Sequence, residues 1–376
     1  MSRITTLDQF EEEYRRGIDE PMSPRAWREV TEEWLRRHSE GSGDYNPLHR
    51  DRAYAAGARF HSLTGSPSFL FSIDFGANAS IWGHLSRDDV AMKDLSILYI
   101  GADIEWFRPV WLGDRVRSIE TPVGVKRRSM PQLGEALVCS GRTDYYNHRG
   151  EKFASLTNHM LRFANPGTGV EAAPPDPDRP QVAPDPLVWA RTRRGGEVRH
   201  FEDVAIGEEL PELPKGTYTT TELYLFSHGT LTLGRSAEVD EGTIDMGAGG
   251  RADPEYARKN RAQSAQFDYG PQRITWLSQI ATDWAGDWGD LVSMSAKLRR
   301  PNLVGDTNIV RGRVTGTREV GGQGLGDLRV GVVNHADIET ATAEITVRLP
   351  RRDAGEPREV PLLWAEATSA TPSIYG

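Results

Sequence analysis

A pair of short motifs occurs twice in this chain, and the repeat constrains the fold more than any other feature. Residues 107–114 read FRPVWLGD and residues 299–306 read RRPNLVGD. The Arg-Pro pairs and the Gly-Asp pairs are both separated by 192 residues, so the two copies align without a gap. A shared offset of this kind indicates an internal duplication, and we expect two structurally related units.

A stretch without apolar periodicity separates the two units. Residues 166–197 are rich in Pro, Gly, Asp and Ala, a composition typical of an extended linker. We therefore predict an N-terminal unit at 1–165, a C-terminal unit at 198–352 and a C-terminal tail at 353–376. The length of 376 residues allows two cores, and the hydrophobic content of 38% is typical of a folded protein.

The expected secondary structure repeats in the same way. Apolar segments at 69–82 and 274–288, opened by Pro67 and Pro271, predict one helix in each unit. Four strand-like runs follow each helix, at 95–107, 114–125, 135–146 and 152–163, and at 291–298, 307–317, 328–335 and 341–349. The prediction is an α+β fold in which two antiparallel sheets each wrap a long helix, forming a pseudo-dimer within one chain.

The strongest candidate for chemistry is the segment 41–51, which reads GSGDYNPLHRD. It places a carboxylate, Asp44, and an imidazole, His49, five positions apart around an Asn-Pro turn. Proline fixes its own φ and restricts the preceding residue, so both groups should lie on a rigid bend and could transfer protons. An ordinary turn explains the same spacing, with Asp44 accepting from nearby amides and His49 leading into a helix at 51–58.

This segment, with Asp51 two residues after the histidine, resembles the signature of the MaoC-like (R)-specific enoyl-CoA hydratases and dehydratases, whose unit is the hot-dog fold. Residues 200–208 resemble the opening of a MaoC-like domain, so the resemblance extends to both units and implies a double hot-dog. It implies a hydro-lyase that reversibly adds water to a 2-enoyl-CoA to give an (R)-3-hydroxyacyl-CoA. Coenzyme A would be part of the substrate, and no other cofactor is implied.

The resemblance also assigns roles to the motif. Asp44 and His49 would hold one water between them, and either could be the base or the acid. Asn46 would orient this water or brace the loop. The C-terminal unit has no second copy of the motif near residues 226–234, so one active site per chain is expected.

In the resembled family a backbone N–H at the start of the hot-dog helix binds the thioester oxygen. Counting from His49 places the expected glycine near Pro67, which has no N–H. The candidate substrate-binding donors are therefore Gly65, Ser66 and Ser68. Gly65 is also explained as a turn residue and Ser66 as a helix cap.

Composition and charge exclude several other classes of function. A net charge of −9 argues against a nucleic-acid partner, and no segment is long and apolar enough for a membrane span. The single cysteine, Cys139, and a polar N-terminus without a signal peptide favour the cytoplasm. The nine histidines do not combine with carboxylates or with Cys139 at zinc-like spacing, so no metal is expected.

Two alternatives share the same fold. A hot-dog acyl-CoA thioesterase would activate water with a carboxylate and release free thiol. A non-catalytic subunit would bind acyl-CoA without turnover. Because the duplication already pairs two units within one chain, further assembly into a homodimer is optional.

Overall fold

The computed structural model describes residues 3–86, 88–91, 94–131, 133–164, 178, 181–183, 190, 192–230, 251–261 and 263–354. Most of the predicted linker at 166–197, and all but two residues of the predicted tail at 353–376, lie outside the described residues.

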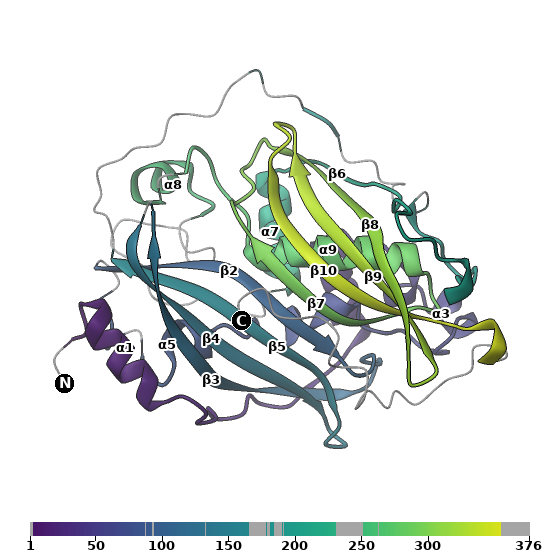
Figure 1. Ribbon diagram of the computed structural model, residues 1–376, viewed down its shortest axis with the longest axis horizontal. Coiled ribbons are helices and arrows are strands. Elements are labelled where there is room, and N and C mark those ends of the chain that lie inside the picture. Colours follow the sequence, from purple (N-terminus) through teal and green to yellow (C-terminus); the bar gives the residue numbers. More distant parts are fainter. Residues whose placement is uncertain are drawn as a thin grey trace.

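Ten antiparallel strands form one continuous sheet, in the order β1-β3-β4-β5-β2-β7-β10-β9-β8-β6 (Figure 1). The strands are β1 (Arg28–Glu29), β2 (Leu95–Trp106), β3 (Arg115–Met130), β4 (Gly134–Asn147), β5 (Lys152–Ala164), β6 (Leu213–Thr217), β7 (Asp290–Leu298), β8 (Thr307–Val320), β9 (Gln323–Asn334) and β10 (Glu339–Leu349). We call β1–β5 and their helices the N-terminal unit, and β6–β10 and their helices the C-terminal unit. All eight predicted strands are confirmed, with ends shifted by a few residues.

The two units join edge to edge where β2 pairs with β7. The pairing runs from Gly101 opposite Lys297 to Glu105 opposite Ser293. Across this junction the Ser295 hydroxyl donates to the Asp103 carboxylate at 2.6 Å. The two sheets predicted from the sequence are therefore halves of one sheet.

The duplicated Gly-Asp pairs build the same turn twice. In the N-terminal unit Asp114 Oδ2 accepts from the Trp111 amide at 3.0 Å, and in the C-terminal unit Asp306 Oδ2 accepts from the Leu303 amide at 2.9 Å. The glycine of each pair has a positive φ, +86° and +97°, which disfavours residues with a side chain. The repeat in the sequence is therefore a repeat of backbone geometry.

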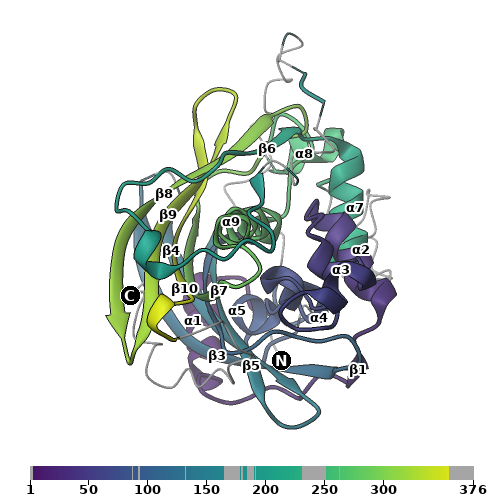
Figure 2. The ribbon, with the colours of Figure 1, turned by 90° about the vertical axis from the view of Figure 1, so that its right-hand side faces the viewer.

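The C-terminal unit contains the predicted long helix, α9 (Gly270–Ala285). Figure 2 shows α9 end-on, with the curved sheet of β6–β10 on one side and helices of the N-terminal unit on the other. Because both sides are covered, nearly every side chain of α9 is buried, including Trp276 and Trp284. Both tryptophans belong to a hydrophobic cluster that also contains Phe69 and Phe71, so the two units share one core.

In the N-terminal unit the prediction of one long helix at 69–82 is wrong. The segment forms a 3₁₀ turn, η2 (Pro67–Phe69), and two short helices, α4 (Leu70–Ile73) and α5 (Asn78–Trp82). Between them Asp74 Oδ1 accepts from the Gly76 amide at 3.0 Å, and Gly76 has a φ of +66°. This bond gives the Gly76 amide a partner that is not a helical carbonyl, which explains why the helix is interrupted between α4 and α5.

The described part of the chain contains further helices outside the sheet. They are α1 (Leu7–Arg16), α2 (Glu32–Ser42), α3 (Arg52–Gly57), α7 (Thr220–Thr230) and α8 (Pro254–Arg261), with 3₁₀ turns η1 (Pro47–His49), η3 (Phe201–Asp203) and η4 (Arg352–Ala354). Of these, the sequence predicted only α3. Figure 2 shows α2, α3 and α7 on the side of α9 that faces away from the sheet. Within the described part of the chain, no helix combines the length and apolar character that a membrane crossing requires.

Candidate active site

The predicted motif follows α2 as a tightly bonded loop. Gly43 ends α2 in the left-handed conformation, with a φ of 65°. Asp44 Oδ1 then accepts from the Asn46 amide at 3.2 Å, and Asn46 Oδ1 accepts from the Leu48 amide at 3.0 Å. Pro47 begins η1, which carries His49. The bonds expected of an ordinary turn are therefore present, and they fix the positions of the two candidate catalytic groups.

The imidazole of His49 has a defined proton arrangement. Its Nδ1 lies 2.8 Å from the Thr64 carbonyl oxygen, which can only accept, so Nδ1 carries the proton. The structure describes no partner for Nε2, which in the neutral ring has a free lone pair. Burial lowers the pKa of His49, opposed by the negative charge of Asp44 and by the bond to Thr64. His49 is therefore neutral at pH 7.

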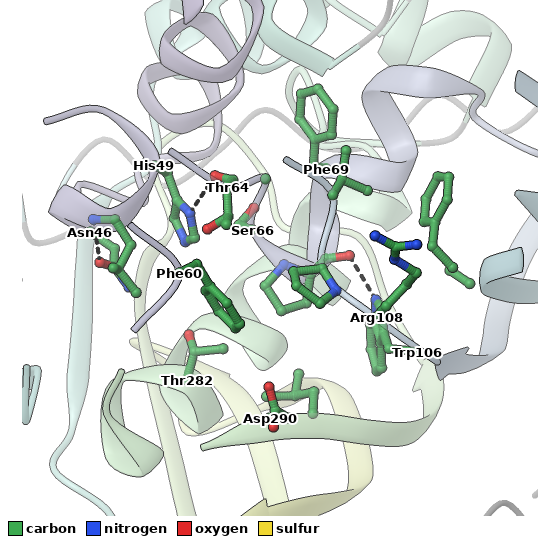
Figure 3. Close-up of a pocket in the computed structure, with 18 of the residues that line it drawn as sticks. Asn46, His49, Phe60, Thr64, Ser66, Phe69, Trp106, Arg108, Thr282 and Asp290 are labelled. Carbon is green, nitrogen blue, oxygen red and sulfur yellow. Dashed lines mark hydrogen bonds between the residues drawn. The ribbon is translucent and has the colours of Figure 1, made fainter. Parts of the chain in front are cut away.

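His49 lies in the wall of a cavity between the two units. The cavity encloses about 830 Å³, including the part open to solvent. Figure 3 shows His49 and Ser66 on one side, and Thr282 and Asp290 of the C-terminal unit on the opposite side. Most of the remaining wall is apolar, formed by Leu48, Phe60, Pro67, Phe69, Leu70, Trp106, Pro109, Val110, Phe153, Ala154 and Leu291. A cavity with a mainly apolar wall and a few polar groups in it is typical of a small-molecule site.

Four of the six predicted site residues line this cavity, namely Asn46, His49, Gly65 and Ser66. Asp44 and Ser68 do not line it, and each is 3% exposed. Asp44 lies close enough to His49 for its charge to raise the pKa of the imidazole. The structure thus brings the predicted pair together. His49 lines the cavity, and Asp44 lies near His49 without lining the cavity.

The segment that carries the candidate donors is fixed against the end of β2. The Gly65 amide donates to the Val110 carbonyl at 2.9 Å, and the Trp106 indole donates to the Pro67 carbonyl at 2.9 Å (Figure 3). Ser66 precedes η2, but its side chain makes no capping bond. Ser66 is therefore at the N-cap position, as the sequence suggested, but its hydroxyl bonds other partners.

Beside the segment 41–51 lies a group of charged residues from the C-terminal unit. Lys215 Nζ donates to the Gly43 carbonyl at 3.3 Å and to Gln279 Oε1. Burial lowers the pKa of Lys215 to about 8, although the charges of Asp44 and Asp283 oppose this shift. Burial and the charge of Asp44 both raise the pKa of Asp283. The C-terminal unit therefore contributes to the electrostatics of the motif.

A second polar contact lies beside the cavity, where the end of the linker segment meets the C-terminal unit. Asp287 Oδ2 accepts from the Tyr54 hydroxyl at 2.6 Å, and its other oxygen accepts from Arg193. Arg193 also donates to the Tyr54 hydroxyl at 3.1 Å. Asp287 lines the cavity. The contact therefore joins three segments at one point of the cavity wall: α3, the residues that follow α9, and the end of the linker segment.

Sequence reasoning missed these residues of the C-terminal unit. No motif connects the segment 41–51 to Lys215, which lies in a short strand. One signal was present, since Gln279 and Asp283 lie four residues apart within an apolar helix. Polar residues at that spacing on a buried helix indicate a polar partner. Among the described residues, no three His, Cys, Asp or Glu side chains form a group that could hold a metal ion.

Comparisons with known proteins agree with this geometry. Residues 23–156 match the family model of the FAS1-like dehydratase domain region. No curated protein sequence gives a significant match.

Several solved structures share the fold. One described as a MaoC-like dehydratase is 17% identical, with a TM-score of 0.67, and the match covers 89% of this chain and 99% of the other. A MaoC domain protein dehydratase from Chloroflexus aurantiacus is 14% identical, with a TM-score of 0.57 and coverage of 91% and 97%. A conserved hypothetical protein from Mycobacterium tuberculosis with a double hot-dog fold is 14% identical, with a TM-score of 0.56 and coverage of 89% and 97%. The comparisons confirm the resemblance to the MaoC-like hot-dog dehydratase family, and the chain has the double hot-dog fold.

Proposed function

We propose that this chain is a hydro-lyase that reversibly adds water to a 2-enoyl-CoA, or a related acyl thioester, to give the (R)-3-hydroxyacyl product. The observation that carries the proposal is the neutral His49, whose Nε2 faces an apolar cavity while the charge of Asp44 acts on its ring. The family model and the fold support a dehydratase or hydratase. The enoyl-CoA substrate and the roles of the two residues are our proposal.

In the hydration direction, His49 Nε2 accepts a proton from a water molecule in the cavity, and the negative charge of Asp44 stabilises the imidazolium that forms. The water oxygen bonds to C3, and the electron pair of the C2–C3 double bond moves toward the thioester carbonyl. The proton that His49 Nε2 has accepted is then delivered to C2. One water is consumed, and Asp44 and His49 return to their starting state. General acid–base catalysis by such groups typically contributes a rate factor of about 10² to 10⁴.

The negative charge that develops on the thioester oxygen needs a hydrogen-bond donor. Pro67 has no N–H, and the Gly65 amide already donates to Val110. Ser66 lines the cavity and carries polar hydrogens, so we assign it as the donor. Asn46 also lines the cavity, and with its Oδ1 bonded to the loop its amide NH₂ is oriented for a ligand or water.

The test is a coupled assay of the purified chain with crotonyl-CoA and with a longer or branched enoyl-CoA. Loss of enoyl absorbance and release of free thiol are followed together. We expect hydration without thiol, and a fall in kcat of about 10² to 10⁴ for Asp44→Asn and for His49→Ala. His84→Ala is the matched control, because His84 is exposed and, among the described residues, its ring bonds only the Glu20 carbonyl.

Each alternative gives a different result. Release of thiol in step with substrate loss would identify a thioesterase. Saturable binding without turnover would identify a non-catalytic subunit. Wild-type rates in both folded variants would disprove the assignment of Asp44 and His49.

A further inference from the structure

Behind the cavity wall, four polar side chains form a closed hydrogen-bond network. His38 of α2 lies at its centre, with 1% of its surface exposed. Its Nδ1 is 2.9 Å from the Ser72 hydroxyl, and its Nε2 is 3.1 Å from the Ser66 hydroxyl and 3.0 Å from that of Ser68. The hydroxyls of Ser66 and Ser68 are 3.1 Å apart. Each bond joins buried groups, so the network holds these side chains in fixed positions.

The directions of these bonds follow from the number of protons available. Ser72 donates its only hydroxyl proton to the Gly229 carbonyl of α7 at 2.9 Å. It must therefore accept from His38, so His38 Nδ1 carries a proton. Burial is the larger cause that lowers the pKa of His38 to about 3, and the nearby His49 adds to it whenever its own ring is protonated, so the His38 ring is neutral. His38 Nε2 is consequently an acceptor facing two serine hydroxyls.

The hydroxyls of Ser66 and Ser68 can both donate to His38 Nε2. When Ser68 donates to Nε2, the acceptor is satisfied and the proton of Ser66 is free to point elsewhere. Ser66 lines the cavity and Ser68 does not, so only Ser66 can reach a ligand. Without a ligand, the Ser66 proton can return to Ser68 or to Nε2, so no buried donor is left unpaired in either state.

We propose that His38 is a positioning residue that, through Ser68, holds the Ser66 hydroxyl as a hydrogen-bond donor to the carbonyl oxygen of the substrate. This inference rests on the proposed function. It supplies a side-chain donor at the position where Pro67 removes a backbone N–H, and where the Gly65 amide is bonded to Val110. A preorganised donor of this kind stabilises charge only as it develops.

A serine beside a histidine also resembles an acyl-transfer nucleophile, but two observations argue against that role. A general base works best with a pKa near the working pH, and the pKa of His38 is far lower. The group behind its Nδ1 is the Ser72 hydroxyl, where nucleophilic triads usually have a carboxylate that stabilises the imidazolium. We therefore expect no release of thiol through Ser66.

The test measures carbonyl polarisation separately from turnover. The probe is 2,4-hexadienoyl-CoA, whose absorbance moves to longer wavelength when a donor polarises its carbonyl. It is bound to the His49→Ala protein, which should not hydrate it, and the spectral shift is compared with that of double variants. Hydration of crotonyl-CoA is measured with the same substitutions in the otherwise wild-type chain.

We expect Ser66→Ala to abolish the spectral shift and to lower kcat about 10² to 10³-fold with little change in KM. Ser68→Ala should reduce the shift although Ser68 does not line the cavity, because Nε2 then takes the Ser66 proton. His38→Gln places an acceptor near the position of Nε2 and should retain the shift. His38→Asn is too short to reach the two serines, so it should reduce the shift because the Ser66 hydroxyl is no longer held in one direction. Ser62→Ala is the control, since in the described part of the chain the Ser62 hydroxyl bonds only the Leu63 carbonyl, and Ser62 does not line the cavity.

The outcomes separate this inference from the proposed function. Hydration that persists with an unchanged shift and kcat in Ser66→Ala would overturn the inference and leave the hydratase intact. Thiol release that depends on Ser66 would overturn it in favour of a nucleophile. Absence of both hydration and probe binding in the folded protein would overturn the proposed function and the inference with it. If His38→Asn does not fold, the spectral shifts of Ser66→Ala and Ser68→Ala test the inference.

Discussion

The imidazole of His49 is subject to opposing influences. Burial disfavours the charged ring, while the Asp44 carboxylate and the bond to the Thr64 carbonyl favour it. Burial is the larger effect, so the pKa of His49 lies below its ordinary value of 6.5. A base with a lowered pKa remains deprotonated in mildly acidic solution, which suits the role proposed for Nε2.

This shift predicts the pH dependence of the reaction. As pH falls, kcat/KM should be retained through 6.5 and lost only at the lower pKa of His49 in the free enzyme. Asp44→Asn removes a charge that favours the imidazolium, so it should lower the pKa of His49 further. An NMR titration of the His49 ring in the wild-type protein and in Asp44→Asn measures this change in pKa without turnover. An acidic limb at or above pH 6.5, or a raised pKa in Asp44→Asn, would contradict this account.

How far the sequence reveals a residue depends on whether its neighbours in space are also neighbours in the chain. Asp44, Asn46 and His49 were found because one rigid turn positions all three. His38 was missed because its partners, Ser66 and Ser72, come from a different segment and meet it only after α2 packs. Lys215 was missed for the same reason at a longer range, since it approaches the motif from the other unit.

At the scale of elements, strand prediction succeeded and helix prediction succeeded only in part. Three successive strands in each unit, β3–β5 and β8–β10, are joined as hairpins, where alternation and turn residues are local signals. The helix at 69–82 failed because tertiary bonds overrode an apolar pattern. Asp74, the residue that ends α4, accepts from Arg25 at 3.1 Å and from the Ser118 hydroxyl at 2.6 Å, and neither partner is near in sequence.

The interruption between α4 and α5 can be tested at Gly76. A Cβ there would lie 2.8 Å from the Thr143 hydroxyl and 3.0 Å from that of Tyr145, and the φ of +66° is itself unfavourable for alanine. Gly150 has a similar φ of +78° with nothing within 4 Å, so Gly150→Ala is a matched control that carries only the conformational penalty. We expect Gly150→Ala to lower the free energy of unfolding by about 1–2 kcal/mol and Gly76→Ala by about 1–3 kcal/mol more. Urea unfolding measures both, and equal losses would show that the space around Gly76 can adjust.

At the scale of the whole molecule, the cavity depends on how the two units are held together. Its walls come from both units, and the network around His38 ends on the Gly229 carbonyl of the C-terminal unit. Besides the β2–β7 junction, the units meet where α2 packs on α7. Because both units also share one hydrophobic cluster, we expect them to unfold in one cooperative transition.

The contact between α2 and α7 allows almost no space for a side chain. A Cβ on Gly41 would lie 2.5 Å from the Leu225 carbonyl oxygen and 2.9 Å from the Gly229 Cα, both of which are backbone atoms. Gly57 is also helical, but a Cβ there meets nothing within 4 Å. Alanine is the better helix former, so Gly57→Ala should stabilise the protein by about 0.5–1 kcal/mol or leave it unchanged. The same substitution at Gly41 should destabilise the protein.

For Gly41→Ala we expect the free energy of unfolding to fall by about 1–3 kcal/mol, because the backbone of α7 must move away. Gly41 lies three residues before Asp44 in the chain, so displacement of α2 also disturbs the spacing between Asp44 and His49. Hydration of crotonyl-CoA should therefore fall at temperatures where the variant is still folded, whereas Gly57→Ala keeps wild-type activity. Urea titration and the hydration assay on both variants test this. A Gly41→Ala protein as stable and active as Gly57→Ala would show that the two units do not need this close approach to form the site.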